Sequence, residues 1–135
     1  YLDALHWAKS IGGLKALFAR ADANAGAIAD WVERTPWIDF LARAPETRSN
    51  TSVCLKVVDP AVAALPADAQ GAFAKAIASF LEKEKVAFDI GAYRDAPAGL
   101  RIWCGATVET ADVEALTHWL DYAFAIEKSK LAKAA

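Results

Sequence analysis

The chain has 135 residues, 56% of them hydrophobic, and a formal net charge of -2. This length and composition suit a single domain with its own core and exclude a disordered chain. The slight negative charge argues against general binding to nucleic acid, and no apolar run is long enough to span a membrane.

Apolar spacing predicts two helices at the start of the chain. The first covers residues 1–10, and the Gly12-Gly13 pair that follows it is typical of a helix C-terminus. The second covers residues 14–33 and ends at Thr35-Pro36, because the residue before a proline is pushed out of the helical region. Residues 37–41 then suit a short edge strand.

The remainder of the chain alternates between strands and helices. Residues 52–58 predict a largely buried central strand, residues 67–85 a helix, residues 88–90 a brief strand and residues 100–104 a better one, before a last helix from Thr110 to about Glu127 and a frayed tail over residues 128–135. This order predicts an α+β fold, with a small, mostly antiparallel sheet and helices packed on one face.

Two features of the composition bear on compartment and completeness. Cys54 and Cys104 lie far apart, each in an apolar run, which predicts reduced and buried thiols in a cytoplasmic protein. No segment has the pattern of a signal peptide. The chain contains no methionine, not even at its first position, so we expect it to be a piece of a longer protein.

The sequence lacks the standard motifs that combine catalytic residues. His6 and His118 are isolated on predicted helices, the two cysteines do not form a CxxC pair, and no glycine-rich phosphate loop is present. We therefore expect no metal site. The lysines fit solvated helical faces and the tail better than a Schiff-base role.

The arginines of the segment AYRDAPAGLRIWCGATVE, residues 92–109, are the candidate functional groups. Arg94 and Arg101 flank a Pro/Gly turn, and Arg101 leads directly into an apolar strand, where a guanidinium needs an anionic partner. The partner could be the carboxylate of a ligand, held bidentately, or an internal acid such as Asp89, Asp95 or Glu109. As a pair, the two arginines could hold both ends of a small dianionic substrate.

Three segments in order carry a resemblance to a known family. They are YLDALHWAKSIGG (residues 1–13), RSNTSVCLKVVD (residues 48–59) and the arginine segment. Together they resemble the C-terminal small domain of the phosphoserine aminotransferases, which are class V pyridoxal-phosphate enzymes. The resemblance covers essentially the whole chain. It implies that residues 1–13 link this domain to a large domain that is missing here, and that residues 14–127 form the small domain.

The resemblance also implies an activity and its site residues. Such enzymes exchange an amino group between glutamate and 3-phosphohydroxypyruvate in serine biosynthesis and, in many bacteria, also serve pyridoxine biosynthesis; they act as cytoplasmic homodimers. Arg101 matches the arginine that binds the substrate α-carboxylate. Arg94 matches an arginine near the substrate phosphate or the distal carboxylate of glutamate, and Tyr93 replaces the family's histidine beside it. The Schiff-base lysine lies outside the chain, so we expect this chain alone neither to bind the cofactor nor to catalyse transamination.

Two other functions remain open at this point. The chain could be the small domain of a different class V aminotransferase, of the serine or alanine–glyoxylate type, in which Arg94 would have no phosphate to bind. It could also be a non-catalytic α+β module that binds an amino acid or a partner protein, because this fold class hosts many functions.

Overall fold

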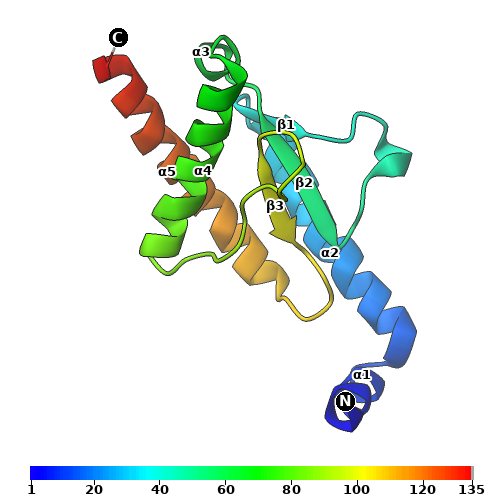
Figure 1. Cartoon of the computed structure of the whole chain (residues 1–135). Coiled ribbons are helices and arrows are strands. Elements are labelled where there is room, and N and C mark those ends of the chain that lie inside the picture. Colours follow the sequence, from blue (N-terminus) through cyan, green and yellow to red (C-terminus); the bar gives the residue numbers. More distant parts are fainter. Residues whose placement is uncertain (135) are drawn as a thin grey trace.

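The structure, a computed structural model, describes residues 1–134 and has the predicted α+β architecture (Figure 1). In chain order the elements are α1 (Leu2–Ser10), α2 (Gly13–Arg34), β1 (Ile38–Phe40), the 3-10 turn η1 (Pro45–Thr47), β2 (Ser52–Val57), α3 (Pro60–Ala63), α4 (Ala67–Lys83), β3 (Leu100–Trp103) and α5 (Thr110–Ala134). The strands pair antiparallel in the order β1-β2-β3, which confirms the central place of β2 and the edge position of β1. The prediction that β2 is largely buried is wrong, because within this strand Val53 and Leu55 are the buried residues and the alternate side chains face away from the core.

The two faces of the sheet differ because side chains alternate along each strand. Val53, Leu55 and Ile102 point into one core, where they join apolar side chains of α2, α4 and α5 such as Ile28 and Leu120. The opposite face, called the open face below, carries partly or fully exposed side chains: Asp39, Ser52, Cys54, Lys56, Arg101 and Trp103. The expected packing of helices on one face is therefore confirmed.

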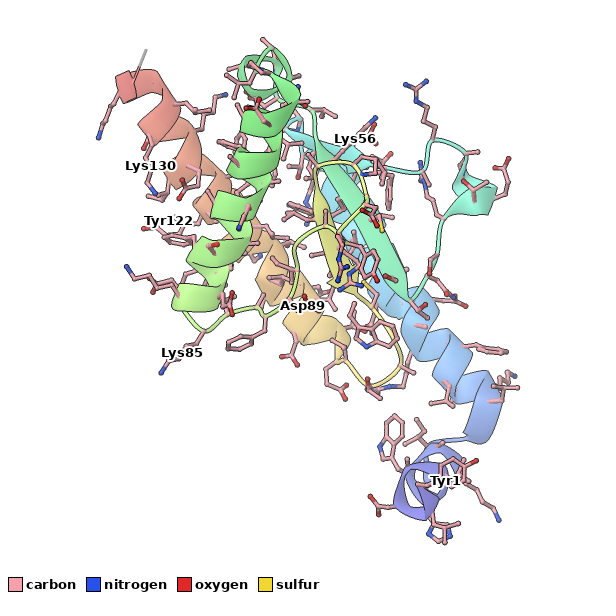
Figure 2. All side chains as sticks on the ribbon, in the orientation of Figure 1. Tyr1, Lys56, Lys85, Asp89, Tyr122 and Lys130 are labelled. Carbon is pink, nitrogen blue, oxygen red and sulfur yellow. The ribbon has the colours of Figure 1, made fainter. Side chains whose placement is uncertain are left out.

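Helix α1 lies at the end of α2 that is farthest from the sheet (Figure 1), and Figure 2 shows Tyr1 at its outer end. None of the residues of α1 is buried. Within residues 1–134, none of the helices combines the length and the apolar composition needed to cross a membrane.

The strand predicted for residues 88–90 is wrong. Helix α4 ends in a Schellman-type turn, in which Lys85 has a φ of 59° and the Val86 N–H donates to the Leu81 carbonyl at 2.9 Å. Asp89 then takes a second left-handed conformation, with a φ of 55°. A strand cannot continue through that conformation, so the main chain of the segment pairs with β3 through an isolated bridge between Gly91 and Leu100 and through the hydrogen bond from the Arg101 N–H to the Ile90 carbonyl.

Helix α5 extends past Glu127 to Ala134, where the sequence predicted a frayed tail over residues 128–135. Lys128 in this extension contacts Asp59 at 2.6 Å, and Lys130 contacts Glu127 at the same distance. Burial by itself raises the pKa of Asp59, but the hydrogen bond and charge of Lys128 and the backbone amides at the start of α3 outweigh it, so its pKa is lowered. Residue 135 lies outside the described residues.

The prediction that both cysteines are buried is half wrong. Cys104 is buried, and burial raises the pKa of its thiol to about 11. Cys54 is exposed, because the alternation along β2 that buries Val53 and Leu55 turns the residue between them to the open face. Its apolar neighbours in sequence therefore did not indicate burial.

Candidate functional site

Strand β3 places Arg101 on the open face of the sheet. The residue lies opposite Cys54 in the register of β2 and β3, and its backbone N–H donates to the Ile90 carbonyl at 2.8 Å. Its main chain is thus held on both sides, by β2 and by the segment that precedes the Arg94 turn. The position of the guanidinium is set by this pairing rather than by a loop.

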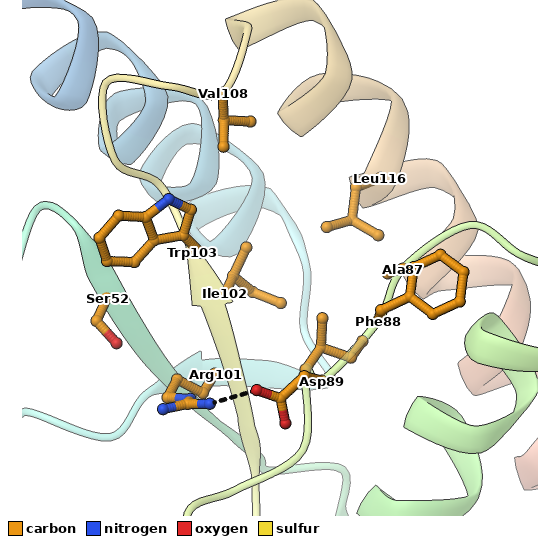
Figure 3. Close-up of a pocket in the computed structure, with 10 residues that line it drawn as sticks. Ser52, Ala87, Phe88, Asp89, Arg101, Ile102, Trp103, Val108 and Leu116 are labelled. Atoms are coloured by element: carbon orange, nitrogen blue, oxygen red, sulfur yellow. Dashed lines mark hydrogen bonds and ion pairs between the residues drawn. The ribbon is translucent and has the colours of Figure 1, made fainter. Parts of the chain in front are cut away.

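A hollow of about 420 Å³ opens beside the Arg101 side chain (Figure 3). Its polar lining residues are Ser52, Asp89 and Arg101, and its walls are mostly apolar side chains that include Phe88 and Trp103. We call it the Arg101 hollow. A mostly apolar hollow with few polar groups is the usual form of a small-molecule site.

The partner of Arg101 within the chain is Asp89. The Arg101 Nη2 donates to Asp89 Oδ2 at 3.1 Å, drawn as a dashed line in Figure 3. Of the two partners that the sequence left open for Arg101, a ligand carboxylate or an internal acid, this contact is the internal acid. The pair is not buried, however, because 34% of the Arg101 side chain and 90% of the Asp89 side chain are exposed. Exposed ion pairs contribute about 1 kcal/mol or less, so this contact leaves Arg101 available to an incoming anion.

Tyr93 and Arg94 lie on the exposed connection between α4 and β3 and line a different hollow, of about 540 Å³. We call it the Arg94 hollow. Lys75 of α4 lines it as well, and small side chains and glycines such as Gly91 and Gly99 form most of its remaining wall. A second cation beside Arg94 makes this hollow suitable for an anion with more than one negative charge.

The two hollows have no lining residue in common. Among the described residues, the structure therefore does not bring the Arg94 and Arg101 guanidinium groups into one cavity. The two arginines are better described as the centres of two neighbouring sites on either side of residues 90–91.

Sequence reasoning did not single out Ser52, Trp103 or Lys75 as lining residues. The first two could have been found by alternation, because Arg101 and Trp103 are two residues apart on β3 and Ser52 pairs with Trp103 on β2. Lys75 could not, because only the folded chain brings α4 beside the Arg94 turn.

The other chemically reactive side chains among the described residues do not come together to form a site. Among residues 1–134, no three His, Cys, Asp or Glu side chains gather in a way that could hold a metal ion. His118 lies on the exposed side of α5, beside a shallow surface formed with Trp119 and Tyr122. Arg20 and Glu109 form a separate ion pair at the other end of the sheet, so Glu109 is not the partner of Arg101.

Comparison with curated proteins identifies relatives over most of the chain. It is 47% identical over 128 residues to the phosphoserine aminotransferase of Methanosarcina barkeri and 46% identical over 128 residues to that of Methanosarcina mazei. Each match covers 95% of this chain and 32% of the relative, so the chain spans about a third of the length of these proteins. The resemblance inferred from the three sequence segments is confirmed. No family model matches the chain.

Comparison with solved structures supports the fold. A phosphoserine aminotransferase from Bacillus circulans subsp. alkalophilus superposes with a TM-score of 0.70 at 17% identity, covering 93% of this chain and 30% of that one. A second phosphoserine aminotransferase, from a study of radiation damage of its Schiff base, superposes with a TM-score of 0.68 at 16% identity, covering 88% of this chain and 30% of the other. The α+β fold is therefore that of a part of these enzymes.

Proposed function

We propose that this chain is the small domain of a phosphoserine aminotransferase, a pyridoxal-phosphate enzyme that exchanges an amino group between glutamate and 3-phosphohydroxypyruvate. The identity to curated phosphoserine aminotransferases supports the activity of the whole protein. The role of this domain rests on one observation, the exposed Arg101 guanidinium at the edge of a mostly apolar hollow. In this role Arg101 binds the substrate α-carboxylate.

The geometry suits that role in two ways. A planar guanidinium can donate two parallel hydrogen bonds to a carboxylate, which fixes the orientation of the substrate as well as its position. The hydrogen-bonded surroundings of Arg101 hold its main chain before the substrate arrives, so little ordering is required on binding. The domain thus contributes binding and orientation, and the remainder of the reaction site lies elsewhere in the protein.

The Arg94 hollow is the proposed place for the second charged group of the substrate, which is a phosphate in 3-phosphohydroxypyruvate and a distal carboxylate in glutamate. Arg94 and Lys75 supply positive charge there, and Tyr93 supplies a hydroxyl group that can donate to an oxygen. Because the two hollows are separate in this chain, other parts of the full-length enzyme must complete the site that holds both charged groups of the substrate.

Pyridoxal phosphate does not fit either hollow. A site for this cofactor needs a lysine that forms the Schiff base and an acidic or arginine partner for the pyridine nitrogen. The Arg101 hollow has Asp89 but no lysine, and the Arg94 hollow has Lys75 but no acid among its described lining residues. The cofactor therefore belongs to the rest of the full-length enzyme. The homodimer and the cytoplasmic location that the resemblance implies are part of this same proposal.

Steady-state kinetics of the full-length enzyme with matched arginine variants test the assignment. Arg101→Ala should lower kcat/KM about 10- to 100-fold for every substrate, because each one loses a hydrogen-bonded charge. Arg94→Ala should lower it for 3-phosphohydroxypyruvate and for glutamate, which carry a second charged group, more than for an unphosphorylated keto acid with a single carboxylate. Equal losses with 3-phosphohydroxypyruvate and such a monocarboxylate keto acid for Arg94→Ala would favour a serine or alanine–glyoxylate type of enzyme, and no loss for Arg101→Ala would contradict the role of this domain.

A further inference from the structure

We propose that Asp89 is a placeholder for the substrate carboxylate: in the empty site its own carboxylate occupies the edge of Arg101 that the substrate takes on binding. This proposal rests on the proposed function, because it assumes that Arg101 receives a carboxylate. It goes beyond that function by assigning Asp89 a role in setting the affinity for the substrate.

The first support is the chemical identity of the contact. Asp89 offers Arg101 the same group, a carboxylate, that the proposed substrate carries, and it lines the same hollow. One hydrogen bond joins the two side chains, from Arg101 Nη2 to Asp89 Oδ2. A substrate carboxylate that binds two N–H groups in parallel would make the stronger pair and displace the single bond.

The second support is the conformation of Asp89. Its left-handed backbone, with a φ of 55°, interrupts the segment beside β3, and Figure 3 shows its carboxylate directed toward Arg101 on the open face. A residue other than glycine rarely takes this conformation, and Asp and Asn tolerate it better than most. Of the two neighbours of Asp89, Phe88 is exposed and Ile90 is buried. The chain therefore turns at Asp89 and does not form a regular strand there.

The third support is exposure. Because 90% of the Asp89 side chain is exposed, it can swing into water when a ligand arrives, without leaving a buried charge unpaired. Arg101 keeps an anionic partner in both states, first the internal carboxylate and then the substrate. The exchange lowers the affinity for every carboxylate by the free energy of the internal pair.

The test compares Asp89→Asn with a matched loss of charge, Glu84→Gln, at an exposed residue in the same connection between α4 and β3. Asn accepts the left-handed conformation, and Asp89→Gly is a second variant that does so without any side chain. The ligand is glutarate, a dicarboxylate of the substrate class. The readout is the 15N NMR signal of the Arg101 Nε–H group in the full-length enzyme, assigned with Arg101→Lys.

Asp89→Asn and Asp89→Gly should each lower the dissociation constant of glutarate about 1.5- to 5-fold, the range expected for an exposed ion pair. Glu84→Gln should leave it unchanged. In the full-length enzyme the same Asp89 variants should lower KM for glutamate by a similar factor without changing kcat, a split that a merely structural residue would not produce.

The outcomes separate the two proposals. If the wild type binds glutarate at Arg101 and the Asp89 variants bind it equally well or more weakly, the placeholder role is wrong and the role of Arg101 stands. If none of these proteins shifts the Arg101 signal, both are wrong. If Glu84→Gln tightens binding as much as Asp89→Asn, the effect is general electrostatics and the placeholder role is again wrong.

Discussion

The open face of the sheet and the turn that carries Arg94 hold their arginines in different ways. Arg101 is part of β3, lies opposite Cys54 in the register with β2, and donates its main-chain N–H to the Ile90 carbonyl on the other side. Arg94 follows Gly91 and Ala92 on an exposed connection, where the Ala96 N–H donating to the Tyr93 carbonyl makes a local turn. One arginine is placed by the register of a sheet and the other by a turn.

This difference indicates a division of labour within the proposed site. A guanidinium on a strand keeps its place before the ligand binds, so it suits a group that every substrate has, the α-carboxylate. A guanidinium on an exposed turn can adjust, so it suits a second group that differs between substrates. The boundary between the two regions is Gly99, immediately before β3.

The largest expected effect comes from Gly99→Ala, which tests whether that boundary holds β3 in place. A methyl group at Gly99 would overlap the backbone carbonyl oxygen of Leu55, which cannot move without distorting β2. We expect a loss of about 3 kcal/mol in the free energy of unfolding, measured by urea denaturation.

Gly91→Ala is the matched control at the other end of the same turn. A methyl group there meets no heavy atom within 4 Å. Its effect should stay within about 0.5 kcal/mol. Similar losses for both variants would show that the turn, and not the close approach of β3 to β2, limits the stability of this region.

A smaller effect is expected from Asp59→Ala, which lies away from both hollows. Asp59 accepts a hydrogen bond from the Ala61 N–H at the start of α3, so near neutral pH its loss should cost about 1–2 kcal/mol. Because its pKa is lowered in the folded state, its contribution is present above the usual carboxyl pKa and is lost as the pH falls through the lower, folded value.

The difference in unfolding free energy between wild type and Asp59→Ala should therefore shrink in strong acid. Urea denaturation at neutral pH and below about pH 3 measures it. The affinities of the two hollows for their anionic ligands should not change, since Asp59 lines neither hollow. A difference that stays constant with pH would contradict the stabilising ion pair with Lys128.

The smallest effect concerns local opening, read by limited digestion with trypsin. The bond after Arg94 lies in an exposed turn, whereas the bond after Arg101 lies within the paired strand β3. We expect the first cut after Arg94, and cleavage after Arg101 only when the whole domain unfolds. Mass spectrometry of the early products measures the order. Early cleavage after Arg101 would show that β3 opens on its own and would remove the contrast between the regions.

Local sequence signals predicted most of the fold. Gly12-Gly13 and Thr35-Pro36 marked the ends of helices, and short runs of mostly apolar residues predicted the strands. The short helix α3 was missed, although Asp59 followed by Pro60 is a recognised start signal for a helix. The strand at residues 88–90 was predicted from its apolar residues, and the left-handed conformation of Asp89 is not encoded in that composition.

The candidate site was predicted only in part, for a related reason. Arg101 could be singled out because its charge stood against an apolar strand, and Asp89 was among the acids considered as its partner. Which acid pairs with it depends on the turn after α4, and the neighbourhood of Lys75 and Arg94 depends on how a helix packs beside a connection. Such long-range contacts are not visible in local periodicity.

The central claim is that Arg101 exchanges an internal partner for the substrate carboxylate, and a crystal structure of the full-length enzyme with bound glutamate tests it most directly. We expect two hydrogen bonds from the Arg101 guanidinium to the α-carboxylate, with the Asp89 side chain turned out into water. A glutamate whose α-carboxylate lies away from Arg101, with Asp89 still paired to that guanidinium, would contradict the account.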